Sequence, residues 1–198
     1  MSVAKRAFDV VSSAVGLIVL SPVFVAVALA IKATDRGPVF FRQERVGRHG
    51  RTFRIHKFRS MRVATSGSLV TSANDNRITA VGKLLRKAKL DELPQLIDVL
   101  KGDMSVVGPR PEVPKYVELW GAEARREILS VRPGISDPAA IAFRNEQDEL
   151  AAADDAERHY VEVILPKKVA MYRDYVRTHS FVGDLRVVID TLATIVKD

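Results

Sequence analysis

The run "VVSSAVGLIVLSPVFVAVALAI", residues 10–31, decides how this chain is built, because none of its 22 residues carries a charge. Roughly 20 consecutive apolar residues are enough for a helix to cross a bilayer. We therefore expect a membrane helix from about Val3 to Thr34. Ser21 and Pro22 fall near its middle, where a proline removes one backbone hydrogen bond and a serine hydroxyl can satisfy part of the freed backbone. The sequence thus predicts a helix that breaks at these two residues.

Both ends of the run are basic, with Lys5 and Arg6 before it and Lys32 and Arg36 after it. Positive residues tend to stay on the cytoplasmic side of a membrane. This symmetry favours a re-entrant helix that enters the bilayer and returns to the same face. A kinked helix that crosses the bilayer remains the alternative from the residues alone. A secretory signal peptide fits poorly, since the apolar run outlasts the roughly 7–15 residues of such a segment.

The charge of the 198-residue chain is uneven. The net charge is +7, and the chain has no cysteine, which excludes disulfides and thiolate metal sites. Residues 36–110 hold 16 basic and six acidic side chains, whereas residues 111–198 hold 12 basic and 16 acidic ones. A positive middle section suits a polyanion: nucleic acid, anionic lipid or a phosphorylated small molecule. Composition does not choose among these.

The middle section begins with strand patterns. Val39–Phe41 is a short apolar strand, and "VGRHG" is a turn in which Gly47 and Gly50 would supply positive φ. The stretch "TFRIHKFRSM" that follows alternates apolar with basic residues, so a half-buried strand should direct Arg54, His56 and Lys57 outward. Such a face could bind nucleic acid, but no nucleic-acid motif accompanies it, and an anionic membrane surface explains it equally well.

Two further segments follow the strands. Residues 64–77 are rich in Ser, Thr and Asn and are expected to form a mobile polar loop. A helix is expected from about Ile78 to Lys89. Near the C-terminus, Pro166 is expected to restart a helix, and a last amphipathic helix places one apolar face toward its own domain or the membrane surface: Phe181, Leu185, Val188, Leu192 and Ile195.

The candidate chemistry lies in "RKAKLDELPQLIDVLKGDMSVVGPRP", residues 86–111. A short helix is expected here, burying the stripe Leu93, Leu96, Ile97 and Leu100, with Gln95 on its surface. Asp91 and Glu92 precede it, which by itself is typical of a helix cap and of acidic residues answering the helix dipole. Arg86 and Arg110 in the same stretch favour a phosphate site instead, since prolines on both sides of Arg110 fix its direction.

This stretch, together with "KRAFDV", the Ser-Pro-broken helix, "FRSM" and "VRPGI", resembles the bacterial sugar transferases of the monotopic phosphoglycosyl transferase family. The resemblance covers nearly the whole chain. It implies an α+β fold with a re-entrant membrane helix in residues 1–35 and a mostly helical cytoplasmic catalytic domain in residues 36–198, which has a small β element and amphipathic helices at the membrane face. It also implies a minimal catalytic unit, without the extra membrane helices of longer members before Lys5.

The resemblance further implies a reaction. A phosphosugar would pass from a UDP-sugar to a membrane polyprenyl phosphate, undecaprenyl phosphate being expected, to give polyprenyl-diphosphate-sugar and UMP as the first membrane step of a surface glycan pathway. The protein would be monotopic on the cytoplasmic leaflet of the bacterial inner membrane, would not bind nucleic acid, and could oligomerise. Which sugar it accepts stays open.

The residue roles come from the same resemblance. Asp91 would be the nucleophile, and Glu92 would hold a metal ion or relay a proton; the two carboxylates together would bind Mg²⁺. The side chains expected to contact substrate phosphate are Lys57, Arg59, Arg86 and Arg110, and the helix break would lie at Ser21 and Pro22. Many family members read "RPGITG" where this chain has "RPGISDPAAIAFRNE", so Asp137-Pro138 and its neighbours should bear on the choice of sugar.

Two other classes compete with this interpretation. A membrane-anchored scaffold could use the basic face to hold anionic lipid or nucleic acid, but it has no need for a carboxylate pair beside two arginines. An ordinary glycosyltransferase would release UDP rather than UMP, so the nucleotide product separates the two reactions.

Overall fold

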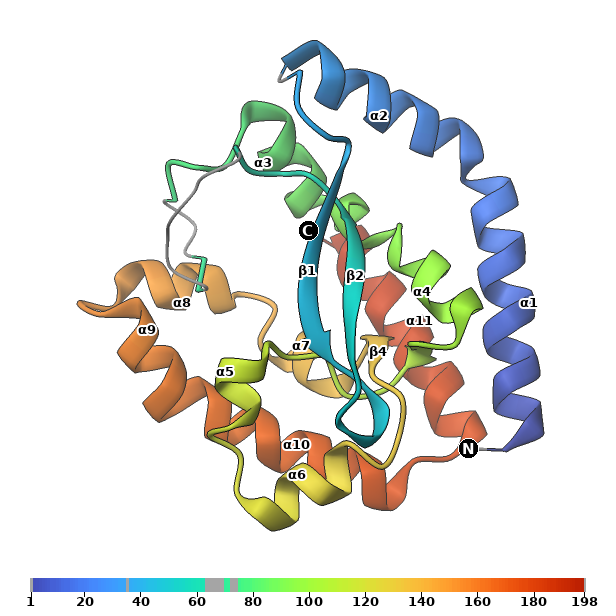
Figure 1. Ribbon diagram of the computed structural model, residues 1–198, viewed down its shortest axis with the longest axis vertical. Helices are drawn as coiled ribbons and strands as arrows, with labels where there is room; N and C mark the ends of the chain where they lie inside the picture. Colours follow the sequence, from blue (N-terminus) through green and yellow to red (C-terminus); the bar gives the residue numbers. More distant parts are fainter. Residues whose placement is uncertain (1, 35, 63–69, 72–74, 198) are drawn as a thin grey trace.

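The protein begins with two helices that meet at a sharp bend (Figure 1). The structure, a computed structural model, describes residues 2–34, 36–62, 70–71 and 75–197. Helix α1 (Val3–Val19) and helix α2 (Ser21–Thr34) are bent by 60° relative to each other. The Ser21 hydroxyl donates a hydrogen bond of 2.8 Å to the carbonyl of Ile18, so the break occurs where the sequence predicts it. Within the described residues, no single helix has the length and composition to cross a membrane; only this bent pair does.

The rest of the described chain is mostly helical with two small sheets, as an α+β fold requires. One sheet is the antiparallel hairpin of β1 (Phe40–Val46) and β2 (Thr52–Phe58); the other is a parallel pair of β3 (Ser105–Val107) and β4 (Gly134–Ser136). The helical segments in chain order are α3 (Ala80–Lys87), η2 (Leu90–Glu92), α4 (Gln95–Lys101), α5 (Pro114–Val117), α6 (Ala122–Ile128), α7 (Pro138–Ala142), α8 (Glu146–Ala152), α9 (Ala156–His159), the π-helical η3 (Tyr160–Ile164), α10 (Leu165–Thr178) and α11 (Phe181–Lys197). Most of the predicted polar loop at 64–77 lies outside the described residues.

The start of α1 is bound to the body of the protein. The ammonium of Lys5 forms a 2.5 Å ion pair with Asp184 of α11, and both side chains are buried. The guanidinium of Arg6 donates to the carbonyls of Val99 and Leu100 at 2.8 and 3.0 Å. These two basic residues therefore hold the first turns of α1 against α4 and α11. The predicted domain boundary at residue 35 stays a prediction.

The hairpin turn differs from the prediction in one detail. A short 3-10 turn, η1 (Arg48–Gly50), joins β1 to β2. Positive φ occurs at His49 (59°) and Gly50 (77°), whereas Gly47 has an ordinary φ of −106°. The prediction of positive φ is therefore confirmed at Gly50 and wrong at Gly47, because the left-handed residues of this turn are adjacent, at positions 49 and 50.

The outward basic face of β2 is also only partly as predicted. Arg54 is exposed and Lys57 is half-buried, but His56 is buried. The ring Nδ1 of His56 lies 2.5 Å from Asp98 Oδ1, and its backbone N–H donates to Asp98 Oδ2 at 2.8 Å. Asp98 belongs to α4, which packs on β2. The strand therefore has neighbours on both faces, and its alternation of apolar and basic residues does not show which side chains are buried and which are exposed.

Helix α4 buries a different face from the predicted one. Gln95, Asp98 and Val99 are buried, whereas the stripe of Leu93, Leu96, Ile97 and Leu100 is only half-buried. Gln95 was expected on the surface and is instead fully enclosed. The reason is that α4 lies between β2 and α1, with Leu96 close to Gly16 of α1. Two faces of the helix are therefore covered, and helical periodicity alone could not show which of them is the more deeply buried.

The C-terminal helices enclose the main core. This core contains Tyr116, Trp120, Ile128, Ile164 and Tyr172, contributed by α5, α6, η3 and α10 and the segments that join them. Pro166 lies in the first turn of α10, as predicted. On α11 the predicted face is half-buried at Leu185 and Val188 but exposed at Phe181 and Leu192, and the side chain of Ile195 lies outside the description.

Candidate active site

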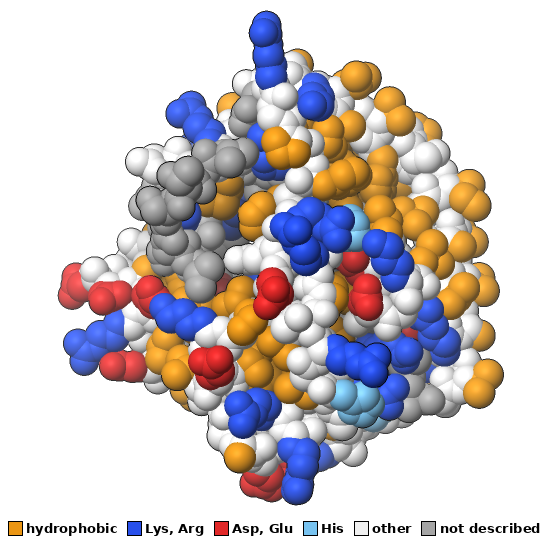
Figure 2. Space-filling view, in the orientation of Figure 1, with side chains coloured by type: hydrophobic (Ala, Val, Ile, Leu, Met, Phe, Trp, Pro, Cys, Tyr) orange, Lys and Arg blue, Asp and Glu red, His pale blue; other side chains and the backbone are white. Residues whose placement is uncertain are grey.

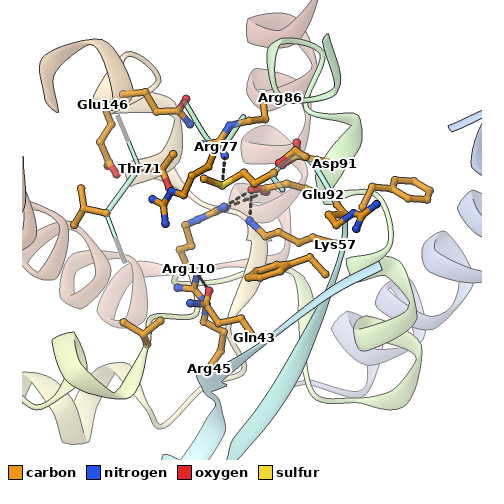
Figure 3. Close-up of a pocket in the computed structure, with 18 of the residues that line it drawn as sticks. Gln43, Arg45, Lys57, Thr71, Arg77, Arg86, Asp91, Glu92, Arg110 and Glu146 are labelled. Atoms are coloured by element: carbon orange, nitrogen blue, oxygen red, sulfur yellow. Dashed lines mark hydrogen bonds and ion pairs between the residues drawn. The ribbon is translucent and has the colours of Figure 1, made fainter. Parts of the chain in front are cut away.

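A pocket of about 530 Å³ lies between the hairpin, η2, the segment after β3 and the helices α5, α8 and α10 (Figure 3). All six side chains predicted to act on substrate line it: Lys57, Arg59, Arg86, Asp91, Glu92 and Arg110. They come from β2 and the residue after it, α3, η2 and the loop after β3, which are far apart in the sequence. The structure therefore brings the whole predicted set to one cavity; their roles stay predictions.

Asp91 and Glu92 do not cap a helix. They form the single 3-10 turn η2, which follows Lys89 in the left-handed region at φ 54°. Pro94 occupies the N-cap of α4, and no side chain accepts a hydrogen bond there. The alternative that Asp91 is simply an N-cap is therefore wrong. The turn instead presents both carboxylates to the pocket.

Glu92 is held between two basic side chains. Lys57 Nζ lies 2.8 Å from Glu92 Oε1, and Arg110 binds both carboxylate oxygens, with Nη1 at 3.1 Å from Oε2. Burial alone would raise the pKa of Glu92, but the charges and hydrogen bonds of Arg110 and Lys57 hold it well below its usual range. Glu92 is therefore a carboxylate at neutral pH.

Asp91 has the opposite environment. Its side chain is buried, and no hydrogen bond joins its carboxylate to another residue in the described part of the chain. Burial raises the pKa of Asp91, the adjacent Glu92 raises it further, and the charges of Lys57 and Arg86 oppose both. A desolvated carboxylate without hydrogen bonds is a better nucleophile than a solvated one, provided that it is ionised.

The position of Arg110 is fixed by the segment that precedes it. Asp9 of α1 accepts hydrogen bonds of 3.0 Å from the Ser105 hydroxyl and the Val106 N–H, so a helix side chain covers the open edge of β3. At the end of β3, a Cβ on Gly134 would lie 2.1 Å from the N of Gly108, so this close approach requires glycine. The loop that carries Arg110 is thus tied to α1 on one side and to β4 on the other.

The other predicted basic residues also lie at the pocket. Arg86 on α3 donates to the sulfur of Met61 at 3.6 Å, and its Nε is buried without a hydrogen-bond partner among the described residues. Such a donor suits a phosphate oxygen. Arg59 is buried beside Gly37 and lines the same cavity.

Several residues that line the pocket are not among the site residues predicted from the sequence. Arg45 of β1 donates to the carbonyl of Pro111 at 3.2 Å and pairs with Glu112 at 3.1 Å. The hydroxyl of Tyr160 donates to Glu112 at 2.5 Å. Glu112 directly follows "GPRP", and this proximity was a usable signal. Nothing local marked Tyr160 or Lys168, whereas Glu146 is the last residue of the stretch "RPGISDPAAIAFRNE" that was expected to bear on the choice of sugar.

Mg²⁺ is usually held by one or two carboxylates together with substrate phosphates and water. Asp91 and Glu92 offer such a donor pair, with the Asp91 oxygens unengaged and those of Glu92 held by Lys57 and Arg110. Among the described residues, no group of three or more His, Asp or Glu side chains is placed to hold an ion by itself. The residues present therefore fit an ion that shares its coordination with a substrate.

Comparison with known proteins gives consistent results. The sequence profile described as "Bacterial sugar transferase" matches residues 1–198. The chain is 39% identical over 193 residues to the UDP-glucose:undecaprenyl-phosphate glucose-1-phosphate transferase of Escherichia coli K12, covering 95% of this chain and 39% of that protein. It is 38% identical over 197 residues to a UDP-N-acetylgalactosamine-undecaprenyl-phosphate N-acetylgalactosaminephosphotransferase of Aeromonas hydrophila, covering 96% and 43%.

A shorter relative matches along most of its length. The exopolysaccharide production protein ExoY of Rhizobium meliloti is 34% identical over 211 residues, covering 97% of this chain and 85% of that protein. The chain thus spans about two fifths of the length of the first two relatives and most of the third.

Proposed function

This chain belongs to the bacterial sugar transferase family, and we propose that it transfers a sugar phosphate from a UDP-sugar to undecaprenyl phosphate, releasing UMP. The observation that carries the proposal is the contrast within one dipeptide. Asp91 is buried and unengaged, whereas Glu92 beside it is clamped by Lys57 and Arg110. We further propose that the product begins a surface glycan.

The proposed reaction has two halves. An oxygen of Asp91 attacks the β-phosphorus of the UDP-sugar, the bond from that phosphorus to the bridging oxygen breaks, and UMP leaves with the electron pair. The sugar phosphate is then an acyl phosphate on Asp91. A phosphate oxygen of the lipid attacks the same phosphorus, the bond to Asp91 breaks, and the carboxylate is restored together with polyprenyl-diphosphate-sugar.

Attack of one anion on another needs charge neutralisation at the phosphate. Arg110 and Lys57 bind the carboxylate of Glu92 in the structure. A guanidinium binds a phosphate through two hydrogen bonds as it binds a carboxylate, so the diphosphate of the donor can compete with Glu92 for Arg110. Arg86 adds a third cation with an unused donor. Mg²⁺ bound by Asp91 and Glu92 would supply further positive charge at the phosphates.

We propose that α1 and α2 form a re-entrant membrane anchor on the cytoplasmic leaflet of the inner membrane. The outer edge formed by these helices is apolar (Figure 2), with exposed Val11, Val15, Ile18, Val25 and Leu29. Both ends of the pair attach to the same body, the first through the Lys5 contacts and the second through the direct connection to β1. A crossing helix would need its ends on opposite sides.

The topology can be tested with single cysteines at Ser2 and Thr34 in intact cells. Both should react with a membrane-impermeant thiol reagent only after the cytoplasm is opened. Replacing Ser21 and Pro22 by Leu and Ala restores an unbroken helix and should shift it toward a crossing form. Labelling of position 2 from the outside of intact wild-type cells would contradict the re-entrant anchor.

The covalent mechanism is tested by UMP release without any lipid acceptor. The wild-type protein should release about one UMP per active site from its UDP-sugar and retain a base-labile sugar phosphate. Asp91→Asn keeps the size of the side chain but removes the anion, so it should abolish both the burst and the adduct. Asp103→Asn, which changes an exposed acid, is the matched control. Strict dependence of UMP release on lipid phosphate, or an active Asp91→Asn protein, would refute the covalent intermediate.

A further inference from the structure

The pocket has a second wall without net charge. Figure 3 shows Glu146 across the cavity from Asp91 and Glu92. On this side Lys168 of α10 forms an ion pair with Glu146 of α8. Tyr160, which lies next to Lys168, donates to Glu112, and the charge of Glu112 is balanced by Arg45. The side that holds Asp91 and Glu92 has an excess of cations instead. The cavity is therefore divided into a positive half suited to phosphates and a charge-balanced half suited to a neutral group.

Lys168 is unusual for a lysine in a pocket wall, because only 6% of the residue is exposed. Its ammonium lies over the rings of Tyr160 and Phe143, 5.4 and 5.9 Å from their centroids. An ammonium has three N–H donors and a carboxylate accepts at both oxygens. Within the described residues only Glu146 pairs with Lys168, so donors on Lys168 and an oxygen on Glu146 remain for a ligand.

The π-helical segment η3 helps to bring these side chains together. Tyr160 is its first residue, and Lys168 follows eight residues later. In a continuous α-helix, residues eight apart are offset by roughly 80° about the axis. The wider turns of η3 reduce that offset, so both residues line the pocket.

The neutral part of a UDP-sugar that fits here is the sugar rather than the base. A nucleobase is normally held by stacking on an aromatic face. The ring of Tyr160 already packs against the Lys168 ammonium and the Tyr116 ring, whose centroid is 5.0 Å away. What the wall offers is adjacent hydrogen-bond donors and acceptors, and a sugar presents hydroxyls that both donate and accept.

We propose that Glu146 and Lys168 form the subsite for the donor sugar and select it by hydrogen bonds to its hydroxyl groups. The inference rests on the proposed function and goes further by naming the residues that read the sugar. The competing role is purely structural, since the same ion pair also joins α8 to α10. Glu149 on α8 provides a matched comparison, because it pairs with His159 at 2.8 Å on the surface and does not line the pocket.

The test measures UMP release by the full chain in detergent from a panel of UDP-hexoses, followed by deoxy derivatives of the best donor. A site built to hydrogen-bond a hydroxyl rejects a donor that lacks it. In the wild-type protein, removal of at least one sugar hydroxyl should lower kcat/KM at least tenfold. In Glu146→Gln that loss should shrink to less than threefold, and Lys168→Met should weaken the same position. Glu149→Gln should behave as wild type. Inhibition by UDP, which lacks the transferred sugar, should not change in any variant.

Three results would overturn the proposal. The first is a Glu146→Gln protein that slows every donor by the same factor without altering their ranking, as a structural role predicts. The second is a variant in which inhibition by UDP weakens as much as binding of the UDP-sugar does, because Glu146 and Lys168 would then bind the nucleotide rather than the sugar. The third is a Lys168→Met protein that discriminates against the deoxy donor as strongly as the wild type does, a result that decides the question if Glu146→Gln does not fold. Absence of UMP release from every UDP-sugar by the wild-type protein is a different result, because it would refute the proposed function itself.

Discussion

Asp137 is a buried carboxylate whose replacement should stabilise the protein. Its Oδ1 accepts a hydrogen bond of 2.9 Å from the N–H of Ala140 and so caps α7, while its Oδ2 is buried with no hydrogen-bond partner among the described residues. Burial raises the pKa of Asp137 to about 6, although the charges of Arg110 and Lys168 oppose the shift. Asp137→Asn keeps the cap, because Asn caps a helix about as well as Asp, and removes the charge.

The magnitude follows from the two pKa values of Asp137. Its ordinary pKa is 3.8 and its folded-state pKa is about 6, so the carboxyl loses its proton at a lower pH in the unfolded chain than in the folded protein. The contribution of Asp137 to the free energy of unfolding is therefore most favourable below pH 4. It falls as the pH rises from about 4 to about 6 and stays constant above that range. The ionised carboxylate costs about 3 kcal/mol at pH 8 but less than about 1 kcal/mol at pH 4. Asp137→Asn should recover these amounts.

Thermal unfolding in detergent, followed by the fluorescence of the single, buried Trp120, measures the effect. At pH 8 the midpoint of Asp137→Asn should exceed that of the wild type by roughly 6–12 °C, because about 3 kcal/mol moves a chain of this size by that amount. At pH 4 the two midpoints should nearly coincide. Asp148→Asn on α8, which changes an exposed acid, should show no gain. A variant no more stable than the wild type at pH 8 would refute the assignment of a buried charge to Asp137.

Three further outcomes test the site. The rate of the UMP burst should fall in acid at a pH above the pKa of an ordinary aspartate, since burial and Glu92 raise the pKa of Asp91. Arg86→Gln removes an opposing charge and should move this fall to a still higher pH, so a shift to lower pH would contradict the account. Asp9→Ala should lower kcat more than tenfold in the wild-type protein but less than twofold in Arg110→Ala, because Asp9 acts through the loop that carries Arg110. Ser12→Ala on the same helix is the control, and an Asp9→Ala loss of equal size in both backgrounds would show that Asp9 acts elsewhere. Arg110→Lys should retain only part of the activity, since a lysine cannot form the two-oxygen contact; full activity would mean that a point charge suffices there.

Much of this protein is readable from local sequence. An uncharged run of membrane length with Ser21 and Pro22 at its centre predicts a broken helix, and the structure has its bend there. The reason is that helix breaking depends on the chemistry of adjacent residues. The same holds for the carboxylate pair at 91–92 and for Pro166 in the first turn of α10. Each of these features arises within a few residues of the chain.

Features that depend on contacts between distant segments required the tertiary structure. His56 and Gln95 have the sequence pattern of exposed residues, yet both are buried, because α4 packs on β2 and on α1. Asp9 holds Ser105 and Val106, which precede the loop that carries Arg110 and lie about a hundred residues later in the chain. Glu146 meets Lys168 only because α8 folds back against α10. Periodicity reports which residues share a face of one element, but which partner covers that face is set by packing across the whole chain.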